Sequence, residues 1–345
     1  MIDDRHDRAA GPAGRGQAGE RAGSPELGVV VAGREDRRPP DEAPAVAALA
    51  DELGYRRLWV GESGPTWDGF VLATAIGRAT HRITMTVGPV PVSVRDPATI
   101  ARAAASVTAL IGRPVGVALG TSSLRMVEGV HGRSRSGAVA ALEDAAARTA
   151  RALRDADPDG RVRANGFAPR LPAAGGELTV AAFGEQAIAV AARHADRMLV
   201  DLVAPDQVRA LRATLTAAAR DSGTRPPRLA AWLPAAVDPT DAAYTQILES
   251  IAGYLSVHGY AETFTAAGYG LAVERARAGA TLEERVAALP REAAHMIGLV
   301  GDADSARTRL RDYADAGLDE IAILPTTSGD NHGRRTLTAL APGIQ

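Results

Sequence analysis

Residues 56–88 read RRLWVGESGPTWDGFVLATAIGRATHRITMTVG, and this stretch decides the fold. Its two ends, 56–60 and 82–88, are short and rich in apolar and β-branched residues, which is typical of buried parallel strands. The segment between them, 68–79, carries apolar residues at helical spacing. A strand, a helix and a second strand in this order predict one βαβ unit.

The same alternation recurs along the whole chain. Strand-like runs fall at 27–33, 56–60, 82–88, 114–120, 177–183, 197–203, 228–237 and 319–325. Helix-like segments fall at 41–53, 68–79, 97–109, 137–154, 184–194, 205–221, 306–316 and 329–340. Eight alternating units in about 320 residues predict a (β/α)8 TIM barrel rather than a doubly wound sheet, which usually has five or six strands.

Two segments are longer than ordinary connections between a strand and a helix. Residues 155–176 are rich in Pro and Gly, and residues 238–295 are largely helical in pattern. We expect both to be insertions that cover the active site. The first 25 residues hold almost no large apolar side chain, so residues 1–25 are expected to be a disordered tail and 26–345 a single barrel domain.

The composition excludes several classes of function. The 345 residues are 46% hydrophobic and 23% charged, with a formal charge of −2, which favours a soluble protein that binds neither nucleic acid nor a membrane. The chain has no cysteine, so thiol chemistry and cysteine-held metals are excluded, and its histidines do not show metal-ligand spacing. No apolar run is long enough for a membrane span or a signal peptide, so a cytoplasmic location is expected.

The first candidate site follows the strand at 56–60. Active sites of barrels form at the C-terminal ends of the strands, and this end carries Glu62, Ser63 and Trp67. A desolvated Glu62 would have a raised pKa suited to proton transfer, whereas the simpler alternative is an ion pair with Arg95. For Trp67 the alternative is an ordinary core aromatic.

Three other strand ends supply candidate ligand contacts. The stretch LGTSSLR (119–125) offers hydroxyl groups and free backbone N–H groups, or is simply a polar turn. AAFGEQA (181–187) leads into a helix N-terminus, which suits a phosphate but is common in barrels. In VGPVPVS (87–93), the Gly88–Pro89 bond suits a cis peptide at modest cost. The alternative is that the prolines simply end the strand. Of the seven histidines, His131 and His258 are the candidates for ligand contact.

The ordered set of segments from about residue 27 to 341 resembles the luciferase-like (bacterial luciferase) superfamily. Within it, the chain is most similar to actinobacterial oxidoreductases that use the deazaflavin coenzyme F420. The segments that carry the resemblance include ALADELGYRRLWVGES, VGVALGTSSLRMVEGVHGR, VAAFGEQAIAVAARHADRMLVDLVAPDQV and IAGYLSVHGYAETFTAAGYG. The resemblance implies a (β/α)8 barrel with an inserted segment, a homodimer formed through helices of its first half, and a deazaflavin ring that carries a hydride at C5.

The resemblance also implies roles for individual residues. Glu62 and Ser63 would line the ring or the substrate, and Gly88 and Pro89 would form the bulge behind the ring. The implied contacts of the ring and ribityl chain are Gly120, Thr121, Ser122 and Ser123, and those of the phosphate are Ala182, Phe183, Gly184 and Glu185. Two positions depart from the family, because many relatives have a histidine or acid at Ser63 and the dehydrogenases have a glutamate at Ser123.

These observations lead to three hypotheses about function. The first is an F420-dependent oxidoreductase that transfers a hydride to or from an apolar or polycyclic small molecule, with Glu62, Trp67 and His131 handling protons and packing the substrate. The second is an FMN-dependent monooxygenase, since no residue in the sequence distinguishes the two cofactors. The third, motivated by Ser63 and Ser123, is a relative that binds or cyclises a ligand without redox chemistry.

Overall fold

The computed structural model describes residues 24–33, 39, 41–62 and 67–343. Eight parallel strands close into a barrel, in the order β1–β2–β3–β4–β5–β6–β7–β9 and back to β1. The strands are β1 (Glu26–Val31), β2 (Arg57–Val60), β3 (Thr84–Pro91), β4 (Val115–Gly120), β5 (Gly175–Ala181), β6 (Arg197–Asp201), β7 (Arg228–Val237) and β9 (Glu320–Pro325). The predicted (β/α)8 barrel and its eight strands are confirmed, while most of the predicted tail, residues 1–23, lies outside the described residues.

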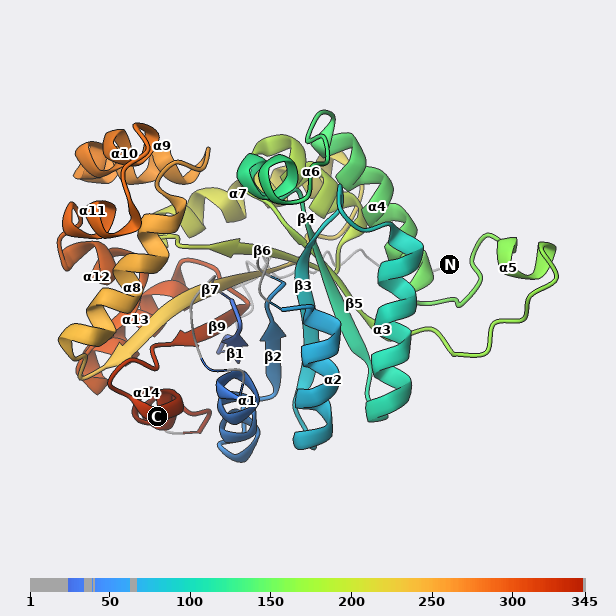
Figure 1. The fold of residues 1–345 in the computed structure, drawn as a ribbon, viewed down its shortest axis with the longest axis horizontal. Helices are drawn as coiled ribbons and strands as arrows, with labels where there is room; N and C mark the ends of the chain where they lie inside the picture. The colour runs from blue at the N-terminus through green and yellow to red at the C-terminus, as the bar shows by residue number, and fades with distance from the viewer. Residues whose placement is uncertain (1–23, 34–38, 40, 63–66, 344–345) are drawn as a thin grey trace, which may run out of the picture.

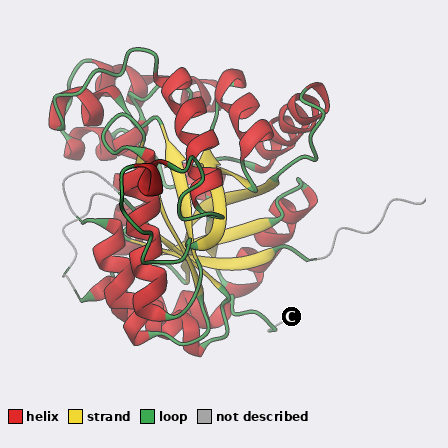
Figure 2. Cartoon of the chain, turned by 90° about the vertical axis from the view of Figure 1, so that its right-hand side faces the viewer, coloured by secondary structure: helices red, strands yellow, loops and turns green. Residues whose placement is uncertain are grey.

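Helices surround the barrel and follow its strands in turn (Figures 1 and 2). They are α1 (Glu42–Glu52), α2 (Gly69–Ala79), α3 (Pro97–Ile111), α4 (Ala138–Ala152), α6 (Glu185–His194), α7 (Pro205–Asp221), α13 (Ala303–Asp315) and α14 (Arg334–Ala339). Local sequence signals set several of the starts: Asp68 accepts the backbone N–H groups of residues 70 and 71, and Asp96 caps α3 ahead of a proline at its first position. Within the described residues, no helix is long and apolar enough to cross a membrane.

A ninth strand, β8 (Leu299–Gly301), was not predicted from the sequence. It pairs in parallel with the last three residues of β7 and lies outside the closed ring of eight. With only three residues, it is too short to stand out as an apolar run.

The insertion at 238–295 forms a helical layer with an apolar cluster of its own. It contains α8 (Asp241–Tyr254), α9 (Tyr260–Phe264), η2 (Thr265–Tyr269), α10 (Gly270–Arg277), α11 (Leu282–Ala287) and α12 (Glu292–Ile297). Ile247, Ile251 and Phe264 pack in its cluster, and all three are nearly inaccessible to solvent. Figure 1 shows this layer, in orange, against one side of the barrel.

The segment 155–176 does not cover the site, so this expectation was wrong. It holds the short helix α5 (Arg161–Ala164) and projects away from the barrel in Figure 1. Asp157 orders its turn by accepting the N–H groups of Val162 and Arg163. The reason is topological, because the segment joins the end of α4 to the start of β5, and such connections lie at the N-terminal end of a barrel.

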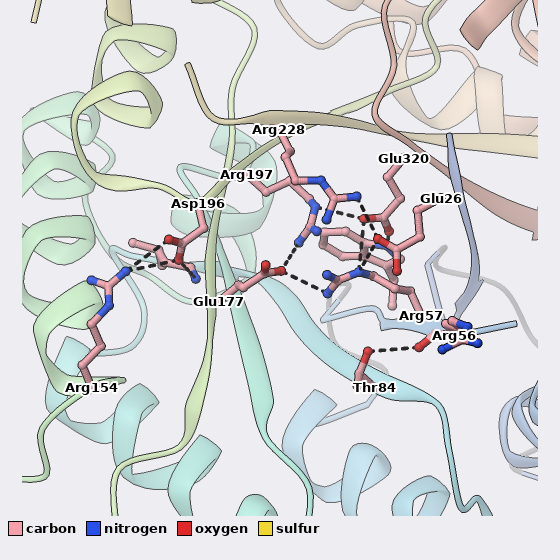
Figure 3. Close-up of polar contacts among 12 residues, drawn as sticks. Glu26, Arg56, Arg57, Thr84, Arg154, Glu177, Asp196, Arg197, Arg228 and Glu320 are labelled. Atoms are coloured by element: carbon pink, nitrogen blue, oxygen red, sulfur yellow. Dashed lines mark hydrogen bonds and ion pairs between the residues drawn. The ribbon is translucent and has the colours of Figure 1, made fainter. Parts of the chain in front are cut away.

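A layer of charged side chains, two of them fully buried, closes the N-terminal end of the barrel. Glu26, Arg57, Arg197, Arg228 and Glu320 stand at or next to the first residues of their strands, and Glu177 joins them from β5 (Figure 3). Arg197 and Glu320 are fully buried, with 2.9 Å between Arg197 Nε and a carboxylate oxygen of Glu320. Above this layer, the rings of Trp59 and Trp232 meet edge to face at 6.0 Å. The opposite end of the barrel is therefore the one that is open to a ligand.

Candidate active site

A large cavity opens at the C-terminal ends of the strands. Its volume is about 2520 Å³, and its walls come from the loops after β1 to β6 and β9, together with α8 and α11 of the insertion. It contains residues from each strand end that the sequence singled out. None of the residues 155–176 contributes to it.

Glu62 lies on the cavity wall directly after β2. Its side chain is only 14% exposed, and the Gly69 N–H donates to its Oε2 at 2.5 Å. Arg95 Nη2 lies 3.5 Å from the other carboxylate oxygen, so the ion pair considered from the sequence is present. Burial nevertheless raises the pKa of Glu62, because desolvation outweighs the hydrogen bond from Gly69 and the charge of Arg95. The carboxyl group can therefore hold a proton at higher pH than an exposed glutamate.

Arg95 is shared between two carboxylates. Its Nη2 lies 2.5 Å from Asp68 Oδ2, much closer than to Glu62, and its guanidinium stacks 5.7 Å from the ring centre of Phe70. Asp68 also caps α2, and these contacts hold its pKa below the usual range. The positive charge of Arg95 is thus taken up mainly by Asp68. This role of Asp68 was not predicted from the sequence, although an Asp before a helical run is a recognisable capping signal.

Gly69 is required where it stands because the backbone of α2 comes so close to Glu62. A Cβ at this position would lie 2.7 Å from Glu62 Oε2 and 2.8 Å from Val87 Cγ1. The absence of a side chain lets the N–H of Gly69 itself face the Glu62 carboxylate, while the next two N–H groups of the helix donate to Asp68. The helix N-terminus and the carboxyl group are therefore held together by one small residue.

Trp67 and His131 line the same cavity as Glu62. Trp67 is 40% exposed, which is more than expected of an ordinary core aromatic. His131 follows the π-helix η1 (Arg125–Val130) and is close enough for its charge to lower the pKa of Glu62, as the smallest of the named causes. The three predicted catalytic residues thus lie on one cavity, while Ser63 is outside the described residues.

The bulge predicted after residue 87 is present in β3. The Gly88–Pro89 peptide bond is cis, and the register between β3 and β4 shifts between Val87 and Val90. Gly88 has a φ of 132°, and a Cβ there would lie 2.3 Å from the carbonyl oxygen of Ala118. Only glycine fits this approach to β4, and it places Pro89 on the cavity wall.

The loop after β4 is fixed by Arg135, a contact that the sequence alone did not indicate. Its Nε donates to the Ser122 carbonyl oxygen at 2.8 Å, and its Nη2 donates to Thr121 Oγ1 at 3.1 Å. Ser122 adopts the left-handed region, with φ of 57°. Ser123 Oγ accepts the N–H of Met126, so this hydroxyl helps to begin the following helix. All four predicted residues of the loop, 120–123, line the cavity.

The loop after β5 meets the insertion. Ala182, Phe183, Gly184 and Glu185 line the cavity at the start of α6. The phosphate contact that the resemblance implies for them stays a prediction. The Phe183 ring lies 4.7 Å from that of Tyr260, which in turn lies 4.9 Å from that of Tyr254. The stretch IAGYLSVHGYAETF therefore supplies an aromatic wall, which its pattern alone did not predict.

The remaining candidate histidine, His258, also lies on the cavity rim. Its side chain is 96% exposed, and its Nδ1 lies 3.2 Å from a carboxylate oxygen of Glu262. Among the described residues, no cluster of His, Asp and Glu side chains has the arrangement of a metal site.

Solved structures share this architecture at low sequence identity. An F420-dependent secondary alcohol dehydrogenase in complex with an F420–acetone adduct is 16% identical and has a TM-score of 0.73, covering 93% of this chain and 99% of its own. The coenzyme F420-dependent tetrahydromethanopterin reductase of Methanopyrus kandleri is 13% identical and has a TM-score of 0.75, covering 92% and 98%. The oxygenating constituent of 3,6-diketocamphane monooxygenase from Pseudomonas putida, in complex with FMN, is 14% identical and has a TM-score of 0.64, covering 93% and 98%.

The structural likenesses show a shared fold, and the comparison with curated protein sequences gives no significant match. The sequence itself matches a family model. That model describes luciferase-like monooxygenases and spans residues 16–320, which is most of the chain. The protein therefore belongs to the luciferase-like monooxygenase family.

Proposed function

We propose that this protein is an oxidoreductase that transfers a hydride between coenzyme F420 and an organic small molecule. The observation that carries the proposal is Glu62, a buried carboxyl group on the cavity wall whose pKa is raised by burial. Hydride transfer at a carbon–oxygen bond is accompanied by proton transfer at the oxygen, which a carboxyl group of raised pKa can perform. The F420-dependent structures with the same fold give further support.

The residues around the cavity fit such a cofactor. Arg135 holds the Thr121–Ser122 loop in place, and the ten-residue helix α6 points its N-terminus at the cavity. Hydroxyl groups, backbone N–H groups and an arginine form a donor set suited to ring carbonyl oxygens and a phosphate. Bound F420 would supply the ring that carries the hydride, since this chemistry belongs to the cofactor.

The chain's own residues would manage the proton and exclude water. Glu62 is oriented by the Gly69 N–H and holds the proton at its carboxyl group. Trp67 lines the same cavity and can pack over a bound molecule. His131 is exposed and within electrostatic reach of Glu62, so it can pass a proton between the buried carboxyl group and solvent.

A second candidate is an FMN-dependent monooxygenase. Two observations favour it: the matching family model describes monooxygenases, and one structure of the same fold is a complex with FMN. Both cofactors have a three-ring system and a ribityl phosphate, so the same donor groups would serve either one.

Titration of the protein with F420 and with FMN, followed by fluorescence quenching, separates the two candidates. We expect F420 to quench at lower concentration than FMN, and a protein isolated with its cofactor to absorb at the shorter wavelength of a deazaflavin. Tighter binding of FMN would replace the first candidate by the second. Binding of reduced F420 with no oxidation by any of a panel of ketones and alkenes would instead favour a non-redox relative.

We also propose that the protein forms a homodimer through the helices of its first half. Val71 on α2 and Leu110 on α3 are 69% and 59% exposed, and the two helices lie side by side (Figure 1). Large apolar side chains left exposed on neighbouring helices are typical of an interface. Light scattering after chromatography should show a dimer, and the double variant Val71→Asp/Leu110→Asp should be a monomer.

A further inference from the structure

One face of helix α8 presents polar side chains to the cavity. Thr245, Gln246, Glu249 and Ser250 all line it. Their spacing places them on neighbouring positions of the same helical face. The insertion therefore contributes a hydrogen-bonding wall, in addition to its aromatic residues.

The side-chain amide of Gln246 has a fixed orientation. Its Oε1 accepts the backbone N–H of Thr327 and that of Ser328, both at 2.9 Å. If the amide were turned over, the Gln246 NH2 group would face the backbone N–H groups of residues 327 and 328, and donors would oppose donors. The NH2 group of Gln246 must point the other way, and it has no hydrogen-bond partner among the described residues. Two donors on a cavity-lining side chain are thus available to a ligand.

The position of Gln246 in the barrel mouth adds to this argument. In a closed ring of eight strands, each strand faces the one four places away, and β9 therefore lies opposite β4. Gln246 is bonded to the loop after β9, whereas Thr121 and Ser122 belong to the loop after β4. A cofactor held by the loop after β4 would leave room for a second molecule in the mouth. The end of that molecule that points away from β4 would reach Gln246.

We propose that Gln246 binds the substrate by donating an N–H to an acceptor oxygen, and that the substrate is a neutral carbonyl compound. Glu249 lies one turn further along the same face, and the cation Arg285 on α11 donates its Nη1 to the Ala252 carbonyl oxygen of α8. The amide of Gln246 is itself a neutral donor, so a neutral acceptor beside Glu249 is favoured. The inference rests on the proposed function, because it takes the barrel mouth to be the substrate site.

The substitution Gln246→Glu separates binding from the structural role of this residue. A glutamate keeps an oxygen that accepts the N–H groups of Thr327 and Ser328, but it has no NH2 group. Gln246→Met removes both functions. Gln207→Glu is the matched control, since Gln207 caps α7 by accepting from the Ala204 N–H and does not line the cavity.

The probes are 1-tetralone and its parent hydrocarbon tetralin, whose binding to the full chain is measured by calorimetry. One hydrogen bond between neutral groups corresponds to about a twofold to tenfold change in affinity. We expect Gln246→Glu to weaken 1-tetralone binding by at least threefold and to leave tetralin binding unchanged. Gln207→Glu should change neither.

Hydrogen exchange at the backbone amides of residues 327 and 328 provides a readout for the loop. We expect protection to persist in Gln246→Glu and to fall in Gln246→Met. Equal affinity of 1-tetralone for the wild type and Gln246→Glu, or no binding of 1-tetralone to the wild type, would overturn the inference. Binding of F420 and FMN is measured separately. Tighter binding of FMN than of F420, or binding of neither, would count against the proposed function and would leave the comparison of 1-tetralone with tetralin unchanged.

Discussion

Replacing Arg197 by methionine tests the charged layer that closes the N-terminal end of the barrel. Arg197 is fully buried, with its Nη1 2.6 Å from Glu177 and its Nε 2.9 Å from Glu320 (Figure 3). Methionine removes the charge but keeps a long apolar stem. The variant therefore leaves the fully buried Glu320 carboxylate with a weaker set of partners.

The magnitude follows from what remains around Glu320. Breaking a buried ion pair by removing one partner costs about 3–5 kcal/mol. The Trp59 Nε1–H still donates to Glu320 at 2.7 Å, and Arg57 Nε still lies 3.6 Å away, so we expect the lower end, about 3 kcal/mol. Burial raises the pKa of Glu320 already, and the loss of Arg197 raises it further. The folded variant therefore favours the protonated Glu320 carboxyl more than the wild type does. The stability that the variant loses relative to the wild type should grow as pH rises.

Urea denaturation followed by circular dichroism measures this loss across a range of pH. The double variant Arg197→Met/Glu320→Gln removes both charges and keeps an acceptor for Trp59, and it should return to within about 1 kcal/mol of the wild type. Arg154→Met is the surface control, because Arg154 and Asp196 are 62% and 35% exposed, and it should lose less than about 1 kcal/mol. A loss below 1 kcal/mol for Arg197→Met, or a double variant no more stable than the single one, would refute the reasoning.

Three further predictions concern the open end of the barrel. Glu62→Gln should lower kcat and leave the cofactor affinity intact. Its free energy of unfolding relative to the wild type should increase as pH rises above the ordinary carboxyl range, because the raised pKa of Glu62 destabilises the folded wild type there. Paired urea titrations at acidic and neutral pH check the sign. Gly69→Ala should cost about 1–3 kcal/mol and displace the Glu62 carboxylate, whereas Gly129→Ala, with open space around it, should not. Arg135→Met should weaken cofactor binding about tenfold in the quenching titration, because the loop after β4 loses two hydrogen bonds.

Much of the fold was predictable because it depends on local patterns. Each strand of the ring is a run of four to ten residues that is mostly apolar, and the helices between them have apolar spacing. Some of these helices also have a recognisable start, such as Asp68 or Asp96. The strand β8 was not predictable, since three residues carry no period. The charged layer at the N-terminal end was missed for another reason: Arg197 and Glu320 are 123 residues apart, and nothing local marks them as partners.

The candidate site was predictable only in part. The place of a residue at a strand end follows from the fold, whereas its contacts with distant parts of the chain do not. Glu62 and the 120–123 loop follow apolar strands, so their place at the barrel mouth follows from the fold. The contacts that set their chemistry come from elsewhere in the chain. Arg95 was considered as a partner of Glu62, but its closer contact with Asp68 was not foreseen. Arg135 reaches Thr121 from beyond the next helix. Such pairings are decided by packing, which no pattern of neighbouring residues encodes.

Gln246 shows how the orientation of a side chain in the insertion depends on the barrel. Helix α8 brings a polar face to the mouth, but the orientation of the Gln246 amide is set by two N–H groups of the loop after β9. That loop follows a strand in the ring of eight, so the ring fixes where the NH2 donors point. A change in the insertion that preserved its sequence pattern but moved α8 along its axis by one turn, about 5 Å, would break both hydrogen bonds. The proposed substrate contact of Gln246 therefore requires the register between α8 and β9, and not merely the presence of a polar helix.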